Sequence, residues 1–380
     1  MRAEARVALF YAAIFAAPGV TLPFLPMFLE ARGLAAETLG LVMGASQLSR
    51  LVATPFGGAA ADALGDRRLA AAVFCLAAAI GFATMLPQAG LAVLVAAVIA
   101  ASVASGPLFP LADAVALGVA TGERADFGRM RAAGSLSFLF ATFIGGLVVE
   151  EAGTEAVPWL ALAGTATAIA SALALPDLGL PQARGFGGVW AVLRLRSFLL
   201  MLVVSGLIQG SHALYYVFSA IDWAAAGLSA TVIAALWVEA VAAEILLLTF
   251  GRRLVVRLGP IGLLAAGGAG SGLRWGLTAT TADARALALI QPLHAATFAM
   301  TMLGAAGLIA RSVPPERGAT AQALHAALGP GLATALLTPI AGALYARFGR
   351  HSYLGMGLAS ALAFVVLPAL AAVKPKGTAP

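Results

Sequence analysis

The chain has 380 residues, of which 61% are apolar and only 11% are charged, and its formal net charge is +6 at pH 7. About 25% of the residues of a soluble domain are charged, so this composition excludes a soluble globular protein and indicates one surrounded by lipid. The basic residues lie in small clusters and form no continuous stripe, which excludes a nucleic-acid-binding surface.

Twelve apolar segments follow one another along the chain, each close to the roughly 20 residues that a helix needs to cross a bilayer. They cover residues 7–29, 36–60, 69–87, 90–120, 133–150, 157–175, 198–221, 230–250, 261–280, 286–310, 320–346 and 352–373. The first follows a short basic N-terminus but precedes no soluble domain, so we interpret it as a span and not as a signal peptide. We therefore predict an all-α membrane protein with twelve transmembrane helices.

Lys and Arg residues favour one side of this map. With the N-terminus in the cytoplasm, most of them fall in cytoplasmic segments, in agreement with the positive-inside rule. The outer loops then hold only Arg32, Arg285, Arg347 and Arg350. An error in the number of spans would disrupt this alternation, so we predict an even number of spans and cytoplasmic termini.

The chain also shows signs of two similar halves. Phe24 and Phe218, and likewise Gly65 and Gly259, are separated by the same number of residues, and parallel repeats are typical of transporters with a central site. A polar stretch rich in Pro and Gly lies near the middle; its end, from Trp190, is either an irregular loop or a segment on the inner membrane surface. We predict an N-terminal six-helix bundle over 1–176, a cytoplasmic linker over 177–197 and a C-terminal six-helix bundle over 198–380.

The loop after the second span has the sequence Gly58-Ala-Ala-Ala-Asp62-Ala-Leu-Gly65-Asp66-Arg67-Arg68. Glycine permits a tight turn, and Asp62 can pair with an arginine or cap a neighbouring helix. The spacing resembles the signature loop of the major facilitator superfamily, apart from the inserted Asp66. The resemblance implies a loop that stabilises one conformational state, formed by Gly58, Asp62, Gly65, Arg67 and Arg68; an ordinary cytoplasmic turn is the alternative. In the second half, Val256 takes the place of the aspartate.

A closer resemblance lies in the seventh span. Residues Gln209 to Tyr216 read Gln-Gly-Ser-His-Ala-Leu-Tyr-Tyr and resemble the seventh span of permeases related to the bacterial 3-phenylpropionate transporter. The likeness extends to Arg50, Asp113, Glu244, Arg274 and His294. It implies the major facilitator fold and proton-driven transport, because this branch is similar to the sugar and nucleoside proton symporters.

Ionisable and amide side chains occur inside several spans. An ionisable residue in lipid costs roughly 3 kcal/mol on insertion scales, so such residues are expected to face the bundle interior. The set consists of Arg50, Asp113, Glu239, Glu244, Arg274, His212, His294 and His325, with Gln47, Gln209 and Gln291. We therefore predict a polar site within the bundle.

Position along each span gives an approximate depth, at about 1.5 Å per residue. Four side chains share a depth near the midplane, namely His212, Glu239, Arg274 and His294. Depth favours Glu239 as the partner of Arg274, whereas the family resemblance favours Glu244, and both remain open. Arg50 is expected to extend to Asp113, either to contact the solute or only to fix helix register.

Two spans carry polar and aromatic side chains on one face. On the seventh span, the positions i, i+3 and i+7 are Gln209, His212 and Tyr216, and on the tenth they are Gln291, His294 and Phe298. Such faces suit an amphipathic organic solute with a ring. Alternatively, these side chains only hydrogen-bond one another between helices.

The spans hold more carboxylates than arginines, so one acid is in surplus and can hold a proton. Our hypothesis is that protonation of Glu239 or Glu244 releases Arg274 to bind an anionic solute. We therefore predict a secondary active transporter that moves a small organic solute by alternating access and proton-coupled symport, with an aromatic acid as the candidate solute. Export of a drug or metabolite by proton antiport is one alternative, and a polytopic membrane enzyme is another.

Other protein classes lack support in the sequence. It has no nucleotide-binding loop of the Gly-x-x-x-x-Gly-Lys type, no serine nucleophile elbow and no zinc-binding histidine pair. Cys75 is the single cysteine and has no metal-ligand spacing around it. We expect no metal, no cofactor and no nucleic-acid partner, and a monomer in the inner membrane of a bacterium.

Overall fold

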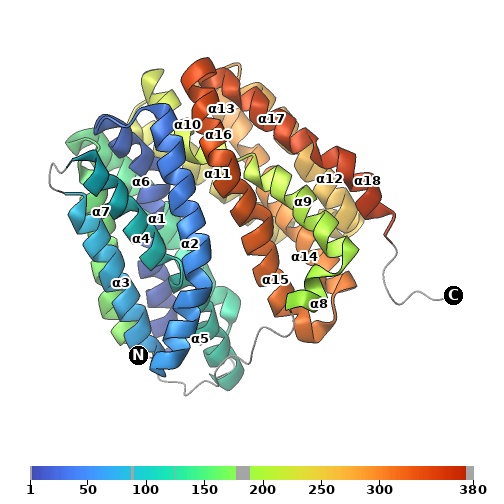
Figure 1. Ribbon diagram of the computed structural model, residues 1–380, viewed down its shortest axis with the longest axis horizontal. Coiled ribbons are helices and arrows are strands. Elements are labelled where there is room, and N and C mark those ends of the chain that lie inside the picture. The colour runs from blue at the N-terminus through green and yellow to red at the C-terminus, as the bar shows by residue number, and fades with distance from the viewer. Residues whose placement is uncertain (1, 87–89, 124, 177–188, 374–380) are drawn as a thin grey trace. The chain divides into compact units, whose positions relative to one another are not determined.

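Helices form every regular element in the computed structural model, which describes residues 2–86, 90–123, 125–176 and 189–373 (Figure 1). Within this part, ten helical stretches are long and apolar enough to cross a membrane. The predicted second span, α2 (Ala36–Leu64), is not among them, because glycine and polar residues interrupt its apolar sequence. The stretch Gly318–Ala371 has 54 residues and covers both the eleventh and the twelfth predicted spans. The fold therefore agrees with an all-α membrane protein of about twelve spans.

The chain divides into two units, of which the first comprises Met1–Ala183 and Gly227–Ala235. Its helices are α1 (Ala3–Ala31), α2, α3 (Arg67–Thr84), α4 (Leu91–Ser105), α5 (Leu108–Glu123), α6 (Phe127–Ala152) and α7 (Ala156–Leu173). The predicted fourth span is two helices, since Gly106 and Pro107 separate α4 from α5 and proline supplies no backbone donor.

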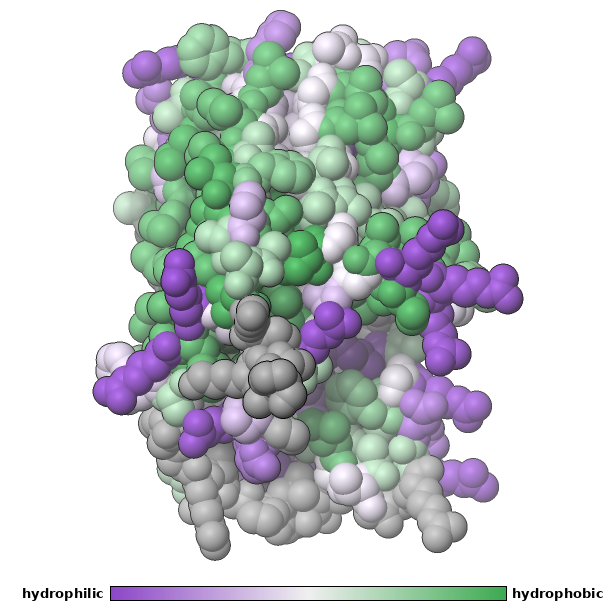
Figure 2. All heavy atoms as spheres, turned by 90° about the vertical axis from the view of Figure 1, so that its right-hand side faces the viewer, coloured by the Kyte–Doolittle hydropathy of each residue, from purple (hydrophilic) through white to green (hydrophobic). Residues whose placement is uncertain are grey.

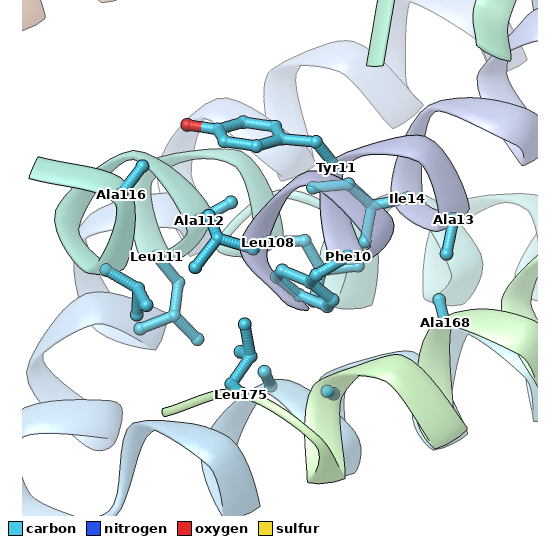
Figure 3. Packing of buried hydrophobic residues seen from close by; sticks show 14 of the residues in the cluster. Phe10, Tyr11, Ala13, Ile14, Leu108, Leu111, Ala112, Ala116, Ala168 and Leu175 are labelled. Carbon is cyan, nitrogen blue, oxygen red and sulfur yellow. The ribbon is translucent and has the colours of Figure 1, made fainter. Parts of the chain in front are cut away.

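The core of the first unit lies between α1, α3, α5 and α7. Figure 3 shows Phe10 of α1 between Leu108 of α5 and Leu175, which follows α7, and it shows Ala13 above Ala168 where α1 and α7 approach. Small side chains such as these alanines let membrane helices pack closely. This packing holds α1, which carries Tyr11, against α5, which carries Asp113.

The second unit comprises Arg184–Ala226 and Leu236–Pro380. Its helices are α8 (Val189–Leu193), α9 (Arg196–Gly210), α10 (Ala213–Ala225), most of α11 (Ala230–Phe250), α12 (Arg252–Thr278), α13 (Ala284–Ile290), α14 (Thr301–Ser312), α15 (Gly318–Ala326), α16 (Leu332–Phe348), α17 (Tyr353–Ala361) and α18 (Ala363–Ala371). The short helix α8 falls at the end of the predicted linker, whose residues 177–188 lie outside the described part.

Several spans of the second unit are not continuous α-helices. A 3₁₀-helix, η1 (Gln291–Leu293), and a π-helix, η2 (Ala295–Met300), join α13 to α14. A second π-helix, η4 (Ala327–Gly331), joins α15 to α16 and contains Pro330. Gly259 has a φ of 63° and precedes Pro260, so α12 is kinked where the ninth span was predicted to begin. Proline and π-turns are known causes of such breaks.

Large apolar side chains cover much of the outside of both units. Leu246, Phe250, Leu358 and Val365 are examples from the second unit, each more than half exposed. On the face seen in Figure 2, hydrophobic residues cover most of the upper half below the top edge, and hydrophilic residues gather at the top edge and from mid-height downward. This distribution suits a surface that contacts lipid acyl chains.

Candidate functional site

A fully buried arginine, Arg274 of α12, forms the centre of the polar site in the second unit. Its Nη2 donates to Oε1 of Gln291 at 2.8 Å, and its Nη1 lies 2.9 Å from Nδ1 of His294 and 3.4 Å from Oγ1 of Thr297. Among the described residues, no carboxylate lies within ion-pair distance of Arg274. The guanidinium is therefore held by neutral acceptors.

The broken tenth span brings these acceptors onto one face. Gln291 begins the 3₁₀-turn, His294 follows it, and Thr297 lies in the π-helix. Pro292 has no backbone N–H and so prevents a regular α-helical turn here. Gln291, His294 and Thr297 are spaced three residues apart. The 3₁₀-turn is tighter than an α-helical turn and the π-turn is wider, and together they keep these three side chains facing α12.

Aromatic rings cover the rest of the guanidinium. The Cζ atom of Arg274 lies 4.5 Å from the ring centre of Tyr215 and 4.7 Å from that of Trp275. Tyr215 in turn stacks on Trp237 of α11 at 4.6 Å. The Nε donor of Arg274 has no hydrogen-bond partner among the described residues. The site thus combines a buried cation, aromatic faces and an unused donor, which suits a solute with a ring and an anionic group.

His294 connects Arg274 to a carboxylate. Arginine can only donate hydrogen bonds, so Nδ1 of His294 must accept and a neutral ring carries its proton on Nε2. That Nε2 lies 3.6 Å from Oε2 of Glu244 on α11. Protonation of both ring nitrogens is incompatible with the contact to Arg274, so a neutral His294 ring lies between Arg274 and Glu244.

His212 is fixed in the opposite tautomer. It lies between α9 and α10, where its Nδ1 is 3.0 Å from the backbone carbonyl oxygen of Gln209 and therefore donates. Its Nε2 accepts from Oγ1 of Thr297 at 2.9 Å, and its ring stacks on Tyr216 at 5.6 Å. Thr297 thus joins His212 to Arg274. Gln209 contributes its backbone, whereas the sequence pattern suggested its side chain.

Glu239 and Glu244 differ in their contacts. Neither touches Arg274 directly, and Glu239 forms no ion pair or hydrogen bond with the described residues. Depth along the helix favoured Glu239 as the partner of Arg274, but depth does not tell which face of the helix a side chain is on. Five residues turn an α-helix by about 140° beyond a full turn, so the two carboxylates lie on different faces of α11.

The expected contact between Arg50 and Asp113 in the first unit is wrong. Asp113 accepts hydrogen bonds from Tyr11 of α1 and from Arg131 of α6, each at 2.5 Å. Arg50 is exposed on α2, and its Cζ lies 5.4 Å from the ring centre of Phe109.

His325 lies in a separate part of the second unit. Its side chain is buried. Its Nε2 lies 2.9 Å from Oγ of Ser205 on α9. This contact joins α15 to α9, so the structure gives His325 a packing role.

The predicted conformational loop forms a tight junction between α2 and α3. Gly65 ends α2 with a φ of 68°, and the inserted Asp66 caps α3 by accepting from the backbone N–H groups of Arg68 at 2.9 Å and Leu69 at 3.2 Å. The side chain of Arg68 donates to Asp66 and holds its pKa below the usual range. Asp62 pairs with Arg67 at 3.5 Å. The inserted residue therefore provides the cap, and Asp62 provides the ion pair.

The comparisons with known proteins agree with this fold. A model of the MFS_1 like family matches residues 5–354. The chain belongs to this branch of the major facilitator superfamily. This family member is 31% identical to the "Probable 3-phenylpropionic acid transporter" of Escherichia coli strain K12 over 96% of this chain and 95% of the relative.

A second relative and a solved structure are also similar to this chain. The family member is 27% identical to the maltose permease of Geobacillus stearothermophilus over 90% of this chain and 87% of the relative. Its fold is similar to the crystal structure of the nucleoside transporter NupG, with a TM-score of 0.85 and 15% identity over 98% of this chain and all of that one. The protein is therefore a multi-pass membrane transporter of a small solute, and the alternative of a membrane enzyme is excluded.

Proposed function

We propose that this transporter carries a small aromatic acid together with a proton, by alternating access. The observation that carries the proposal is the buried guanidinium of Arg274, which has aromatic faces around it and no carboxylate in contact among the described residues. A carboxylate on the solute supplies the missing counter-charge, and its ring packs on Tyr215 and Trp275. The 31% identity to the 3-phenylpropionic acid transporter supports this class of solute.

Glu244 is the proposed proton site. When Glu244 is ionised, its charge balances Arg274 through the neutral His294 bridge. When Glu244 takes a proton, the positive charge of Arg274 is left without compensation and the site favours an anion. Proton binding and solute binding then strengthen each other by the same factor, as linkage requires.

Uptake by proteoliposomes tests this proposal. Purified protein is reconstituted with an alkaline interior, and accumulation of radiolabelled 3-phenylpropionic acid is measured against protein-free liposomes, because weak acids also cross lipid unaided. We expect Glu244→Gln to lose accumulation driven by the pH gradient and to keep solute exchange, since glutamine mimics the protonated acid. The matched variant Glu239→Gln removes a carboxyl from the same helix and should accumulate normally.

The opposite outcomes contradict specific parts of the proposal. Normal accumulation by Glu244→Gln together with loss in Glu239→Gln would move the proton site to Glu239. Expulsion of preloaded solute by an inward proton gradient would show antiport, which is the mechanism of an exporter. Uptake that ignores the pH gradient would show a facilitator.

The predicted surroundings complete the proposal. We place the protein as a monomer in the inner membrane of a bacterium, with both termini in the cytoplasm. The domain limits of 1–176 and 198–380, with a linker between them, belong to the same proposal. Alternating access would then move the second unit, which holds Arg274, relative to the first.

A further inference from the structure

The junction turn between α11 and α12, taken as residues 250–259 and including the first residues of α12, carries an unbalanced group of positive charges. Arg252, Arg253 and Arg257 are all exposed, and among the described residues no Asp or Glu forms an ion pair with them. Arg253 and Arg257 are one helical turn apart and share a face of α12. Three like charges this close repel one another unless an anion lies between them.

This turn is the second-half counterpart of the conformational loop. Gly259, the counterpart of Gly65, also has a positive φ (63° and 68°), but its ψ is 175° whereas that of Gly65 is −8°, so the chain turns at both glycines with different geometry. The acid is not preserved, because Val256 stands where the first half has Asp62. In the first half, Asp62 neutralises Arg67, whereas the second half keeps its arginines without a carboxylate.

Apolar side chains lie beside these arginines. Phe250 is 76% exposed and Val256 is 74% exposed, and both lie within two residues of an exposed arginine. A free anion such as phosphate would contact the arginines only. A ligand with an anionic head and an apolar tail satisfies the guanidinium groups and covers the apolar side chains together.

We propose that Arg252, Arg253 and Arg257, with Phe250 and Val256, bind the headgroup and upper acyl chains of an anionic phospholipid. The arginines contact the lipid phosphate, and Phe250 and Val256 contact its acyl chains. The first-half loop balances its arginine with Asp62, whereas the second-half turn has no such carboxylate and binds a lipid phosphate in its place. This inference is independent of the solute and of proton coupling.

Native mass spectrometry of the purified full chain tests the site. Phosphatidylglycerol and phosphatidylcholine with identical acyl chains are titrated separately, and bound lipid is counted. Each basic side chain near a membrane surface favours anionic lipid by about fivefold, so we expect Arg252→Gln/Arg253→Gln/Arg257→Gln to weaken phosphatidylglycerol binding by at least about tenfold. Phosphatidylcholine binding should not change.

Two further variants separate this site from a general effect of charge. The control Arg129→Gln/Arg285→Gln/Arg347→Gln removes the same charge from dispersed exposed positions and should bind phosphatidylglycerol as the wild type does. Val256→Asp restores the carboxylate of the first-half loop, keeps every arginine, and should lower phosphatidylglycerol binding several-fold. Val256 is exposed, so this change leaves no cavity.

Three results would overturn the inference. Unchanged phosphatidylglycerol binding by the triple variant or by Val256→Asp would show that the turn is not the site. An equal loss in the dispersed control would show an effect of net charge alone. Displacement of bound phosphatidylglycerol by millimolar inorganic phosphate would show that the turn binds a free anion. Because lipid is counted without transport, a wrong solute assignment does not affect the result.

Discussion

At the scale of single residues, the site depends on the forked shape of the Arg274 guanidinium. Its two terminal nitrogens reach acceptors on either side, Gln291 and His294, while its flat face meets Tyr215 and Trp275. A lysine keeps the positive charge but has no fork and no flat face. Charge alone therefore does not explain why an arginine occupies this position.

We predict that Arg274→Lys lowers the kcat/KM of solute uptake by roughly 10- to 100-fold, because a hydrogen bond to a charged group contributes about 1.5–3 kcal/mol. Initial uptake rates in proteoliposomes measure the effect. The matched variant Arg285→Lys changes an exposed arginine and should transport normally. If Arg274→Lys transports as well as the wild type, the fork is not used for binding.

Sequence reasoning recovered the residues of this site better than their contacts. The i, i+3 spacing of Gln291 and His294 was visible, but Thr297, which joins His212 to Arg274, was not given a role although it continues the same spacing. Its signal was weak because threonine is common in membrane helices and carries no charge. The tautomers of His212 and His294 depend on three-dimensional neighbours and have no sequence signal.

At the scale of helices, apolar length predicted where the spans lie but not where they break. The predicted single span over 90–120 is two helices, and the tenth and eleventh spans contain π-helices. The estimate of depth at 1.5 Å per residue assumes that each span is one regular α-helix. A 3₁₀-turn or π-turn changes the direction in which the side chains after it point, and the estimate does not include this change. Depth also missed the partners of Asp113, which are Tyr11 and Arg131.

An ion pair joins two helices at one end of the first unit. Arg32, which follows α1, donates from Nε at 2.6 Å and from Nη2 at 2.5 Å to the carboxylate of Glu155, which precedes α7. These hydrogen bonds lower the pKa of Glu155. A carboxyl group with a lowered folded-state pKa stabilises the fold above its unfolded pKa of about 4.3, and this contribution is lost as pH falls through the folded-state value.

We therefore predict that Glu155→Gln lowers the free energy of unfolding at pH 7 by about 0.5–1 kcal/mol, the upper range for an exposed pair, because the pair is bidentate. The difference from the wild type should decrease as the pH falls from about 4.3 toward 3. Unfolding by sodium dodecyl sulfate in mixed micelles, followed by circular dichroism from pH 3 to pH 8, measures both values. A difference that stays constant from pH 8 to pH 3 would show that glutamine disturbs packing and that charge is not the cause.

At the scale of the whole chain, the topology depends on the number of spans. Ten stretches are long and apolar enough to cross the membrane, α2 is a further helix of 29 residues, and Gly318–Ala371 has enough residues for two spans. Counting them in this way gives an even number, which predicts that both termini lie on one side. The distribution of arginines favours the cytoplasm for that side.

Thiol labelling in intact cells checks this topology. Cys75 is fully buried, so the wild type should give little background labelling. We predict that Arg2→Cys and Gly377→Cys react with a membrane-impermeant maleimide only after the membrane is permeabilised, because both termini face the cytoplasm. Thr281→Cys lies between α12 and α13 in a predicted outer loop and should react in intact cells. Labelling of one terminus without permeabilisation would mean an odd number of spans. Two parallel halves with the same number of spans require an even total, so this result would also contradict the predicted repeat.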